Sequence, residues 1–239
     1  MNKFLLAATI SLLIFSVNEQ IKAQEAKASQ PSASAQKSQQ FEEWNADFSG
    51  NKLDENKWDR FNFEGGSGGK LEVKDGEVRI RSTSKTRAGI RSVKTFSGDR
   101  FIAEAHLAKV GAGLPEPGSS GATLGYGALT ILFDGSGRNR IEWILTSEGT
   151  FEAWAVTDGQ AERLDNRKLG TKMKNPVLSV VRRGDEFLFV INSPEGKPED
   201  AQIGLKSNIK NMPKSFRLML YGYGSSENNW KSARVVVAK

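Results

Sequence analysis

Short runs of alternating apolar residues, separated by turn residues, are the feature that most constrains this chain. Runs such as GYGALTILFD (125–134), TFEAWAV (150–156) and EFLFVIN (186–192) recur along it. Gly, Asp, Asn, Pro and Ser lie between the runs about every 8–12 residues, which is typical of a β-sandwich or β-barrel. Apart from the N-terminal segment, no run of about 12 residues carries a helical apolar stripe free of Gly or Pro. The sequence therefore predicts an all-β domain.

Residues 1–28 are typical of an export signal rather than of a folded domain. A short basic start, MNK, precedes an apolar run at residues 4–17 that is about 14 residues long and too short to span a bilayer. Small residues allow cleavage after Ala23 or after Ala28. We therefore expect an exported protein, periplasmic or extracellular, whose mature chain has no transmembrane segment.

The rest of the chain predicts a short linker and one domain. Residues 29–40 are rich in Ala, Ser and Gln and predict a disordered linker, and no second linker interrupts residues 41–239. The chain has no cysteine, which excludes disulfides and cysteine-ligated metals, so a sizeable core must hold the domain together. Its net charge is +6, but no Lys/Arg run forms a nucleic-acid stripe, and we expect no nucleic-acid partner. Nothing in the sequence sets the oligomeric state.

The stretch IEWILTSEGTFEAW (141–154) predicts a hairpin whose turn fixes its register. A two-residue turn would force Glu148 to a positive φ angle, which glutamate resists. A three-residue loop with Gly149 in the left-handed region avoids that strain. Ile144 then pairs with Glu152, and Glu142 pairs with Trp154.

This register separates a core face from a polar face. The core face is apolar throughout and holds Ile141, Trp143, Leu145, Phe151, Ala153 and Ala155. The other face holds Arg140, Glu142, Ile144, Glu152 and Trp154. Glu142 and Glu152 would be diagonal neighbours with Cα atoms about 7–8 Å apart. Three interpretations stay open: a solvated face where Glu152 pairs with Arg140, a ligand-binding surface, or a glycosidase pair with carboxyl groups about 5–9.5 Å apart.

The same alternation identifies further candidates. If the strands concerned share one sheet, its outer face gathers Glu104, His106, Tyr126, Arg140, Glu142, Glu152, Trp154, Tyr221 and Tyr223. Aromatic rings flanked by hydrogen-bonding groups suit sugar rings. We therefore predict a ligand site made of Trp154, Glu142, Glu152, Arg140, Tyr221, Tyr223 and Tyr126. The weaker candidates for catalysis are Glu142 with Glu152, or Glu104 with His106.

Several segments carry a resemblance to a known superfamily. DFSGNKLDENKW (47–58) and LEVKDGEVRIRS (71–82) are similar to the opening of concanavalin A-like lectin/glucanase domains. VRRGDEFLFVINS (181–193) resembles their late hairpin, and residues 215–239 resemble their final strand pair. The resemblance covers about residues 41–239 and is strongest to laminin-G-like domains of exported bacterial proteins. It implies a two-sheet antiparallel jelly-roll sandwich with a concave face.

The functional motifs of that superfamily are incomplete in this chain. Its laminarinase-like hydrolases use Glu-x-Asp-x-(x)-Glu along one strand, whereas IEWIL offers only Glu142. RAGIRS, EAHL and LMLYGYG match its polysaccharide lyases only in part. Many members of the superfamily bind a structural calcium ion, so the resemblance allows but does not require one here, with Asp47 as a weak candidate ligand, although Arg234 stands where the last strand would need an acid. No other cofactor is expected.

The sequence thus predicts an exported, lectin-like β-sandwich that binds a carbohydrate or polysaccharide. It leaves two alternatives open. One is a glycoside hydrolase or polysaccharide lyase of the same fold. The other is a structural envelope or matrix domain that docks to another protein.

Overall fold

The computed structural model describes residues 40–63, 69–82, 87–111, 124–168, 175–192, 202–224 and 226–239. The predicted signal peptide (1–28) and all but the last residue of the predicted linker (29–40) lie outside the described residues. Within these ranges, no helix is long and apolar enough to span a membrane.

Two antiparallel sheets of eight strands each make up the described domain. Sheet A contains β1 (Phe41–Asp47), β3 (Lys70–Lys74), β4 (Glu77–Arg81), β7 (Arg100–Val110), β12 (Val177–Arg183), β13 (Glu186–Asn192), β14 (Gln202–Asn208) and β16 (Glu227–Ala238). The strand order is β14-β13-β12-β7-β16-β4-β3, and β1 also pairs with β16.

Sheet B contains β2 (Trp58–Asn62), β5 (Ala88–Ser92), β6 (Phe96–Ser97), β8 (Tyr126–Leu132), β9 (Arg140–Thr146), β10 (Thr150–Thr157), β11 (Gln160–Lys168) and β15 (Ser215–Tyr223). The strand order is β11-β10-β9-β8-β15-β5-β2, and β6 also pairs with β15. The predicted all-β sandwich is confirmed.

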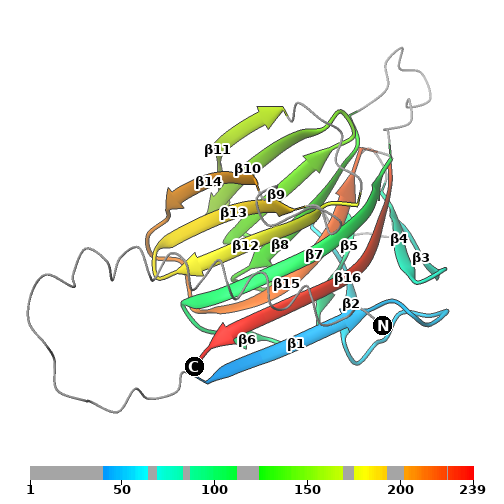
Figure 1. The fold of residues 1–239 in the computed structure, drawn as a ribbon, viewed down its shortest axis with the longest axis horizontal. Coiled ribbons are helices and arrows are strands. Elements are labelled where there is room, and N and C mark those ends of the chain that lie inside the picture. Colours follow the sequence, from blue (N-terminus) through cyan, green and yellow to red (C-terminus); the bar gives the residue numbers. More distant parts are fainter. Residues whose placement is uncertain are drawn as a thin grey trace, which may run out of the picture. The chain divides into compact units, whose positions relative to one another are not determined.

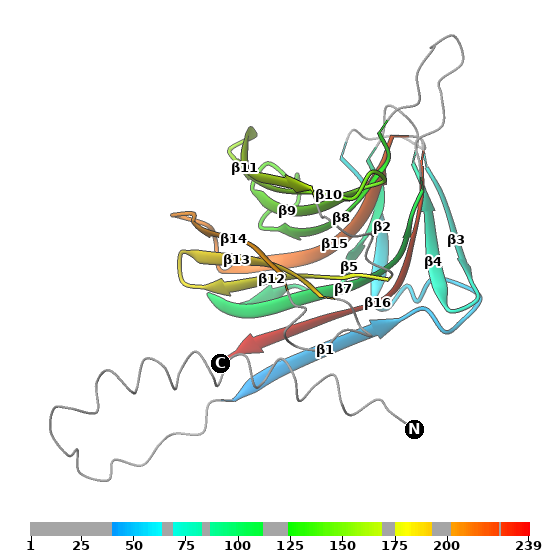
Figure 2. The ribbon, with the colours of Figure 1, turned by 45° about the horizontal axis from the view of Figure 1, so that its top comes forward.

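The two sheets are stacked and bend together (Figure 1). Figure 2 shows β2 and β5 of sheet B on the inside of the bend and β3 and β4 of sheet A on the outside. The face of sheet B that points away from sheet A is therefore concave.

The main core lies between the sheets, and the 141–154 hairpin contributes to it as predicted. Gly149 has φ 80°, Glu152 pairs with Ile144, and Trp154 pairs with Glu142. All six predicted core residues of this hairpin are buried in the inter-sheet cluster. The indole N–H of Trp143 donates to the carbonyl oxygen of Val190 in sheet A (3.0 Å), so this tryptophan links the two layers.

The β3–β4 hairpin also follows its sequence. Asp75 and Gly76 have φ angles of 55° and 76°, the left-handed pair that a two-residue type I′ turn requires. β4 then places Val78 and Ile80 in the core.

Candidate functional site on the concave face of sheet B

The concave face of sheet B carries a second apolar cluster, separate from the core between the sheets. Its fully covered members are Ala128, Leu132, Ile144, Met219 and Tyr221. Partly buried aromatic side chains pack against them: Phe61, Phe63, Tyr126 and Trp154. The middle of the concave face is therefore filled by side chains, and its open parts lie at the margins.

Trp154 forms one margin. It sits on β10, one strand in from the edge strand β11, and points away from the core that holds Trp143. Its indole N–H donates to Oε2 of Glu152 (2.8 Å). Arg163 on β11 is its register partner, with the guanidinium carbon 5.8 Å from the centre of the indole ring. A partly exposed indole, a carboxylate and a guanidinium thus stand side by side.

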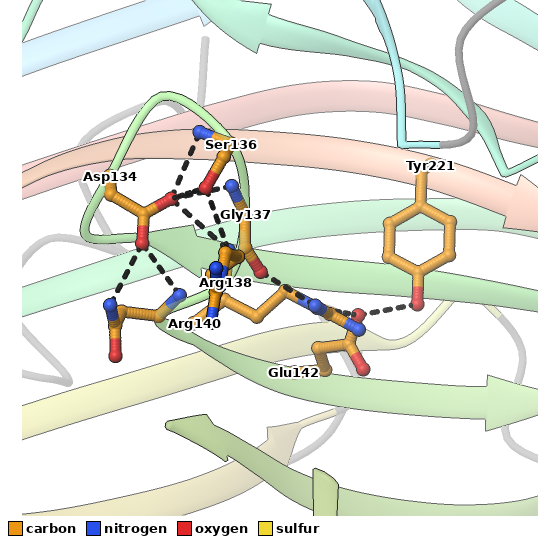
Figure 3. Close-up of polar contacts among 8 residues, drawn as sticks. Asp134, Ser136, Gly137, Arg138, Arg140, Glu142 and Tyr221 are labelled. Carbon is orange, nitrogen blue, oxygen red and sulfur yellow. Dashed lines mark hydrogen bonds and ion pairs between the residues drawn. The ribbon is translucent and has the colours of Figure 1, made fainter. Parts of the chain in front are cut away.

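Glu142 lies next to Trp154 in the register but is much less accessible. Its Oε1 accepts hydrogen bonds from Nε of Arg140 and from the hydroxyl of Tyr221, both at 2.8 Å (Figure 3). Tyr221 is fully buried, and burial, followed by the negative charge of Glu142, raises the pKa of its hydroxyl well above the ordinary value. The hydroxyl therefore stays protonated and acts as a donor.

The guanidinium of Arg140 also donates to the loop between β8 and β9. Its Nη1 donates to the carbonyl oxygen of Gly137 at 2.6 Å. This loop is built around Asp134, whose two carboxylate oxygens accept hydrogen bonds from four successive backbone N–H groups, at residues 136–139 (Figure 3). Burial by itself raises the pKa of Asp134, but hydrogen bonds from Ser136 and Asn139 outweigh it and lower the pKa.

The same loop is tied to the turn between β10 and β11. The guanidinium of Arg138 donates to the carbonyl oxygen of Asp158 (2.9 Å), and the N–H of Asp158 donates to the side chain of Asn139 (3.0 Å). Two neighbouring turns therefore brace each other. The loop that holds Arg140 is fixed by these contacts rather than by packing alone.

The side chain of Phe63 packs on the middle of the concave face. It directly follows β2, and its ring centre lies 4.6 Å from the guanidinium carbon of Arg140 and 5.5 Å from the ring centre of Tyr221. A Cβ atom on Gly137 would lie 2.4 Å from the Phe63 ring, so glycine is required for this close approach as well as for its φ of 77°. Phe63 therefore packs on Arg140 and Tyr221, the two residues that donate hydrogen bonds to Glu142.

Tyr126 and Tyr223 form a second margin. Their rings stack with centres 5.2 Å apart, and the guanidinium carbon of Arg87 lies 5.5 Å from the centre of the Tyr223 ring. Both tyrosines are partly exposed. Burial raises the pKa of the Tyr126 hydroxyl, which therefore stays protonated at neutral pH.

No family model matches the chain, and no curated protein matches it. Solved structures do. An endo-1,3-beta-glucanase (laminarinase) catalytic domain from Thermotoga petrophila has a TM-score of 0.60 at 12% identity, covering 84% of this chain and 98% of its own. An inactivated beta-agarase B with agaro-octaose has a TM-score of 0.62 at 11% identity, covering 87% and 97%. The carbohydrate-binding module CBM66 from Bacillus subtilis has a TM-score of 0.51 at 14% identity, covering 72% and 91%.

The chain has a concanavalin A-like jelly-roll fold. At these identities the likeness shows the fold alone, and both enzymes and binding modules occur among the similar structures.

The condition that all the candidate strands share one sheet does not hold, and one of the three open interpretations, a pair between Glu152 and Arg140, is contradicted. Glu104 and His106 do not join the other candidates, because β7 belongs to sheet A and they lie on the opposite sheet. Arg140 pairs with Glu142 rather than with Glu152. Arg140 and Glu142 are two residues apart on one face of one strand, whereas Glu152 lies opposite Ile144 and accepts the Trp154 N–H.

Tyr221 also differs from its expected use. Because it is fully buried, its ring is not presented to a ligand, and its hydroxyl supports Glu142 instead. No alternating pattern in the sequence singled out Phe63, Asp134 or Arg163. The DGSGRN turn did contain a signal, since Asp ahead of Gly and Ser commonly accepts hydrogen bonds from its own turn.

The predicted calcium ligand Asp47 accepts hydrogen bonds from the backbone N–H and the hydroxyl of Ser49. Among the residues that the structure describes, no group of three or more His, Cys, Asp or Glu side chains could hold a metal ion. The calcium ion stays a prediction from the resemblance.

Proposed function

We propose that the protein is an exported, non-catalytic carbohydrate-binding protein that contacts its ligand at the Trp154 margin of the concave face. The observation that carries this proposal is the group of Trp154, Glu152 and Arg163. Sugar rings stack their C–H faces on indole, while a neighbouring carboxylate and guanidinium bind hydroxyl groups. The indole is already oriented, because Glu152 holds its N–H. The N-terminal segment, which is typical of an export signal, would place this surface outside the cytoplasm.

The geometry favours binding over hydrolysis. The outward positions of β9 are Arg140, Glu142, Ile144 and Thr146, which give this strand a single carboxylate. Glu142 is 5% exposed and already accepts two hydrogen bonds on one oxygen. A general acid or base must reach the reacting bond directly or through one water. Glu142 is bound by Arg140 and Tyr221, and Phe63 packs on both of these residues, so little of the carboxylate is accessible to a substrate on the face.

Affinity gel electrophoresis on a panel of soluble polysaccharides tests the proposal. The panel should include β-1,3-glucan, mixed-linkage β-glucan, agarose and acidic polysaccharides. We expect at least one polymer to retard the wild-type protein and Trp154→Ala to lose at least about tenfold in affinity, as for the aromatic anchor of an interface. Phe41→Ala is the matched control, because Phe41 is an exposed aromatic residue of sheet A, 62% accessible, and its loss should change nothing.

The enzyme alternative is tested on the same panel by release of reducing sugar. The proposal predicts no release. Release that disappears in Glu142→Gln would support a hydrolase instead, and retardation that is unchanged in Trp154→Ala would refute the assigned site.

A further inference from the structure

Cations gather at one end of sheet A, where the β6–β7 turn, the β12–β13 turn and the β14–β15 loop meet. Backbone hydrogen bonds join these segments, from the N–H of Gly184 to the carbonyl oxygen of Asp99 (2.7 Å) and from the N–H of Gly98 to the carbonyl oxygen of Lys214 (3.0 Å). The ends of β7, β12 and β13 lie side by side there, at the left of Figure 1. We call the charged residues of this region the basic end. They are six cations and three carboxylates, namely Arg100, Arg182, Arg183, Lys206, Lys210 and Lys214 with Asp99, Asp185 and Glu186.

Two arginines of the basic end stand directly opposite each other. Arg100 of β7 and Arg183 of β12 are register partners, and both residues are exposed. Like charges in this position repel each other and destabilise a sheet. Among the described residues, neither arginine forms an ion pair with a carboxylate. An anionic surface over the pair would relieve the repulsion.

The carboxylates beside the two arginines are engaged by lysines. Asp99 forms an ion pair with Lys214 (2.7 Å). Glu186, the register partner of Arg183, forms one with Lys206 (2.6 Å). Both ion pairs leave the arginines uncompensated, and the basic end keeps an excess of three positive charges.

Arg182 contributes a buried positive charge beneath the same turns. It is 3% exposed, and its guanidinium donates to three backbone carbonyl oxygens, those of Gly184, Met212 and Pro213. These acceptors are neutral, and the carboxylates of Asp99 and Asp185 raise the pKa of Arg182 by less than burial lowers it. The same hydrogen bonds fix the β12–β13 turn to the β14–β15 loop. The backbone that carries the exposed cations is therefore held in place.

Phe41 gives the same end of sheet A an exposed apolar side chain. It is the first residue of β1, pairs with the last residue of β16, and is 62% exposed. β16 lies between β1 and β7, so Phe41 is two strands away from Arg100. The two acids that follow it, Glu42 and Glu43, each form an ion pair with a cation. An anionic surface that meets the basic end is therefore not repelled by free carboxylates next to Phe41.

We propose that the basic end docks on a membrane surface of anionic phospholipids, with Phe41 entering the boundary between headgroups and acyl chains. Lys and Arg side chains are attracted to such a surface, and an aromatic side chain adds apolar contact with the lipid. The cations stand on three neighbouring turns at one end of a sheet, an arrangement that a broad charged surface contacts at once. Trp154 lies on the other sheet, so this site is independent of the glycan surface proposed above.

Cosedimentation of the wild-type protein with unilamellar vesicles tests the proposal. We expect binding to vesicles of equal parts phosphatidylglycerol and phosphatidylcholine, and at least about tenfold weaker binding to vesicles of phosphatidylcholine alone. Added salt should weaken the binding, because it screens exposed charges. Trp154→Ala should bind the vesicles as the wild-type protein does, which keeps this test separate from the test of glycan binding.

Two double variants separate the basic end from net charge. Arg100→Gln with Arg183→Gln should weaken binding to the mixed vesicles at least about tenfold, because each cation near an anionic surface adds to the attraction. Lys70→Gln with Arg81→Gln is the matched control, since these are also exposed register partners on sheet A. Arg81 pairs with the first residue of β16, at the opposite end of that strand from the basic end. The control removes the same charge and should change binding less than about twofold, because distant charges are screened.

Phe41 is tested by truncation and by fluorescence. Phe41→Ala should weaken vesicle binding at least about threefold, because the side chain loses its apolar contact with lipid. Leu124→Ala, which truncates another exposed apolar side chain, 43% accessible, should leave binding unchanged. In Phe41→Trp, the added indole fluorescence should be quenched by brominated acyl chains in the mixed vesicles.

Equal weakening by the two double variants would overturn the proposal, because net charge alone would then drive the attachment. Absence of binding to the mixed vesicles would overturn it as well. A soluble acidic polysaccharide that binds the wild-type protein but not Arg100→Gln with Arg183→Gln, when vesicles do not bind, would assign the basic end to an anionic polymer instead. Unquenched fluorescence in Phe41→Trp would refute the position given to Phe41.

Discussion

Two buried glutamates, one on the outer face of each sheet, are held in different ways. Glu142 on sheet B is 5% exposed and Glu104 on sheet A is 7% exposed. Glu142 accepts from a guanidinium and a buried phenol, both at 2.8 Å. Glu104 accepts from the hydroxyl of Ser179 at 3.1 Å, and the nearest guanidinium nitrogen, on Arg234, is 3.6 Å away.

The difference has an electrostatic consequence for Glu104. Burial raises its pKa by more than the charge of Arg234 and the hydroxyl of Ser179 lower it. Arg234 is also shared with Glu43, whose Oε1 lies 3.0 Å from its Nε. Burial alone therefore does not show that a carboxylate belongs to a binding or catalytic site. The number and distance of its donors decide whether its charge is compensated.

Removing the cation beside Glu142 should destabilise the folded protein most. Arg140→Ala leaves a buried carboxylate with a neutral donor, and we expect the free energy of unfolding to fall by about 3 kcal/mol. Urea denaturation at pH 7 measures it. Arg234→Ala is the matched change on sheet A and should cost less than about 1 kcal/mol, because that arginine is more exposed and farther from its glutamate. Equal losses would contradict the distinction.

The next largest loss of stability should come from removing the phenolic hydroxyl of Tyr221. Tyr221→Phe removes one hydrogen bond to a charged group without changing the ring packing, so we expect a loss of about 1.5–2 kcal/mol in the free energy of unfolding. Tyr223→Phe, whose ring is partly exposed on the same strand, is the control and should stay within about 0.5 kcal/mol of wild type. A loss confined to Tyr223→Phe would refute the role given to Tyr221.

A smaller loss of stability should follow removal of the Phe63 ring, which packs on the two donors to Glu142. Phe63→Ala removes a partly buried ring that packs on Arg140 and Tyr221, and we expect a loss of about 1 kcal/mol in the free energy of unfolding. Phe63→Leu keeps an apolar cover and should lose less. In Phe63→Ala, the Tyr221 hydroxyl and Arg140 should become more accessible, and hydrogen exchange of the Arg140 guanidinium should accelerate. Unchanged exchange would mean that Phe63 does not close the face.

The smallest effect is the pH dependence of Glu104. The pKa of Glu104 is raised in the folded state, so its stabilising contribution is fully present below the ordinary value of 4.5 and is lost as the pH rises through the folded pKa. Glu104→Gln is neutral at every pH. Its Tm relative to wild type should therefore increase as the pH is raised from 4 to 7. A difference that is constant, or that falls with pH, would show that attraction to Arg234 outweighs burial.

Which side chains of the 141–155 hairpin face the core was predictable from the sequence, because one turn fixes the alternation. Gly149 decides the register of β9 with β10, and every side chain of 141–155 then follows by alternation. Sheet membership was not predictable in this way. β7 pairs with β12 and β16, which are distant in sequence, and the alternation within β7 contains no information about its partners.

β11 and β14 are among the strands that were not predicted, and they were missed for a related reason. β11 is QAERLDNRK, a polar segment at the edge of sheet B that is exposed along most of its length, so it shows no alternating apolar pattern. β14 is the edge strand of sheet A and contains Gly204 and Lys206. Edge strands bury little, so their sequences carry little pattern. The position of Phe63 on Arg140 and Tyr221 depends on how sheet B bends, and no local sequence pattern predicts that bend.

Trp143 and Trp154 lie on opposite faces of sheet B, and we propose that the Trp154 face binds a glycan. The most direct measurement follows the indole N–H signals of ¹⁵N-labelled wild-type protein during titration with soluble oligosaccharides from the polysaccharide that retards it. We expect the Trp154 signal to shift in a saturable way, while the Trp143 signal, whose N–H is bound to Val190, stays in place. Saturable binding that leaves the Trp154 signal unchanged would contradict the account.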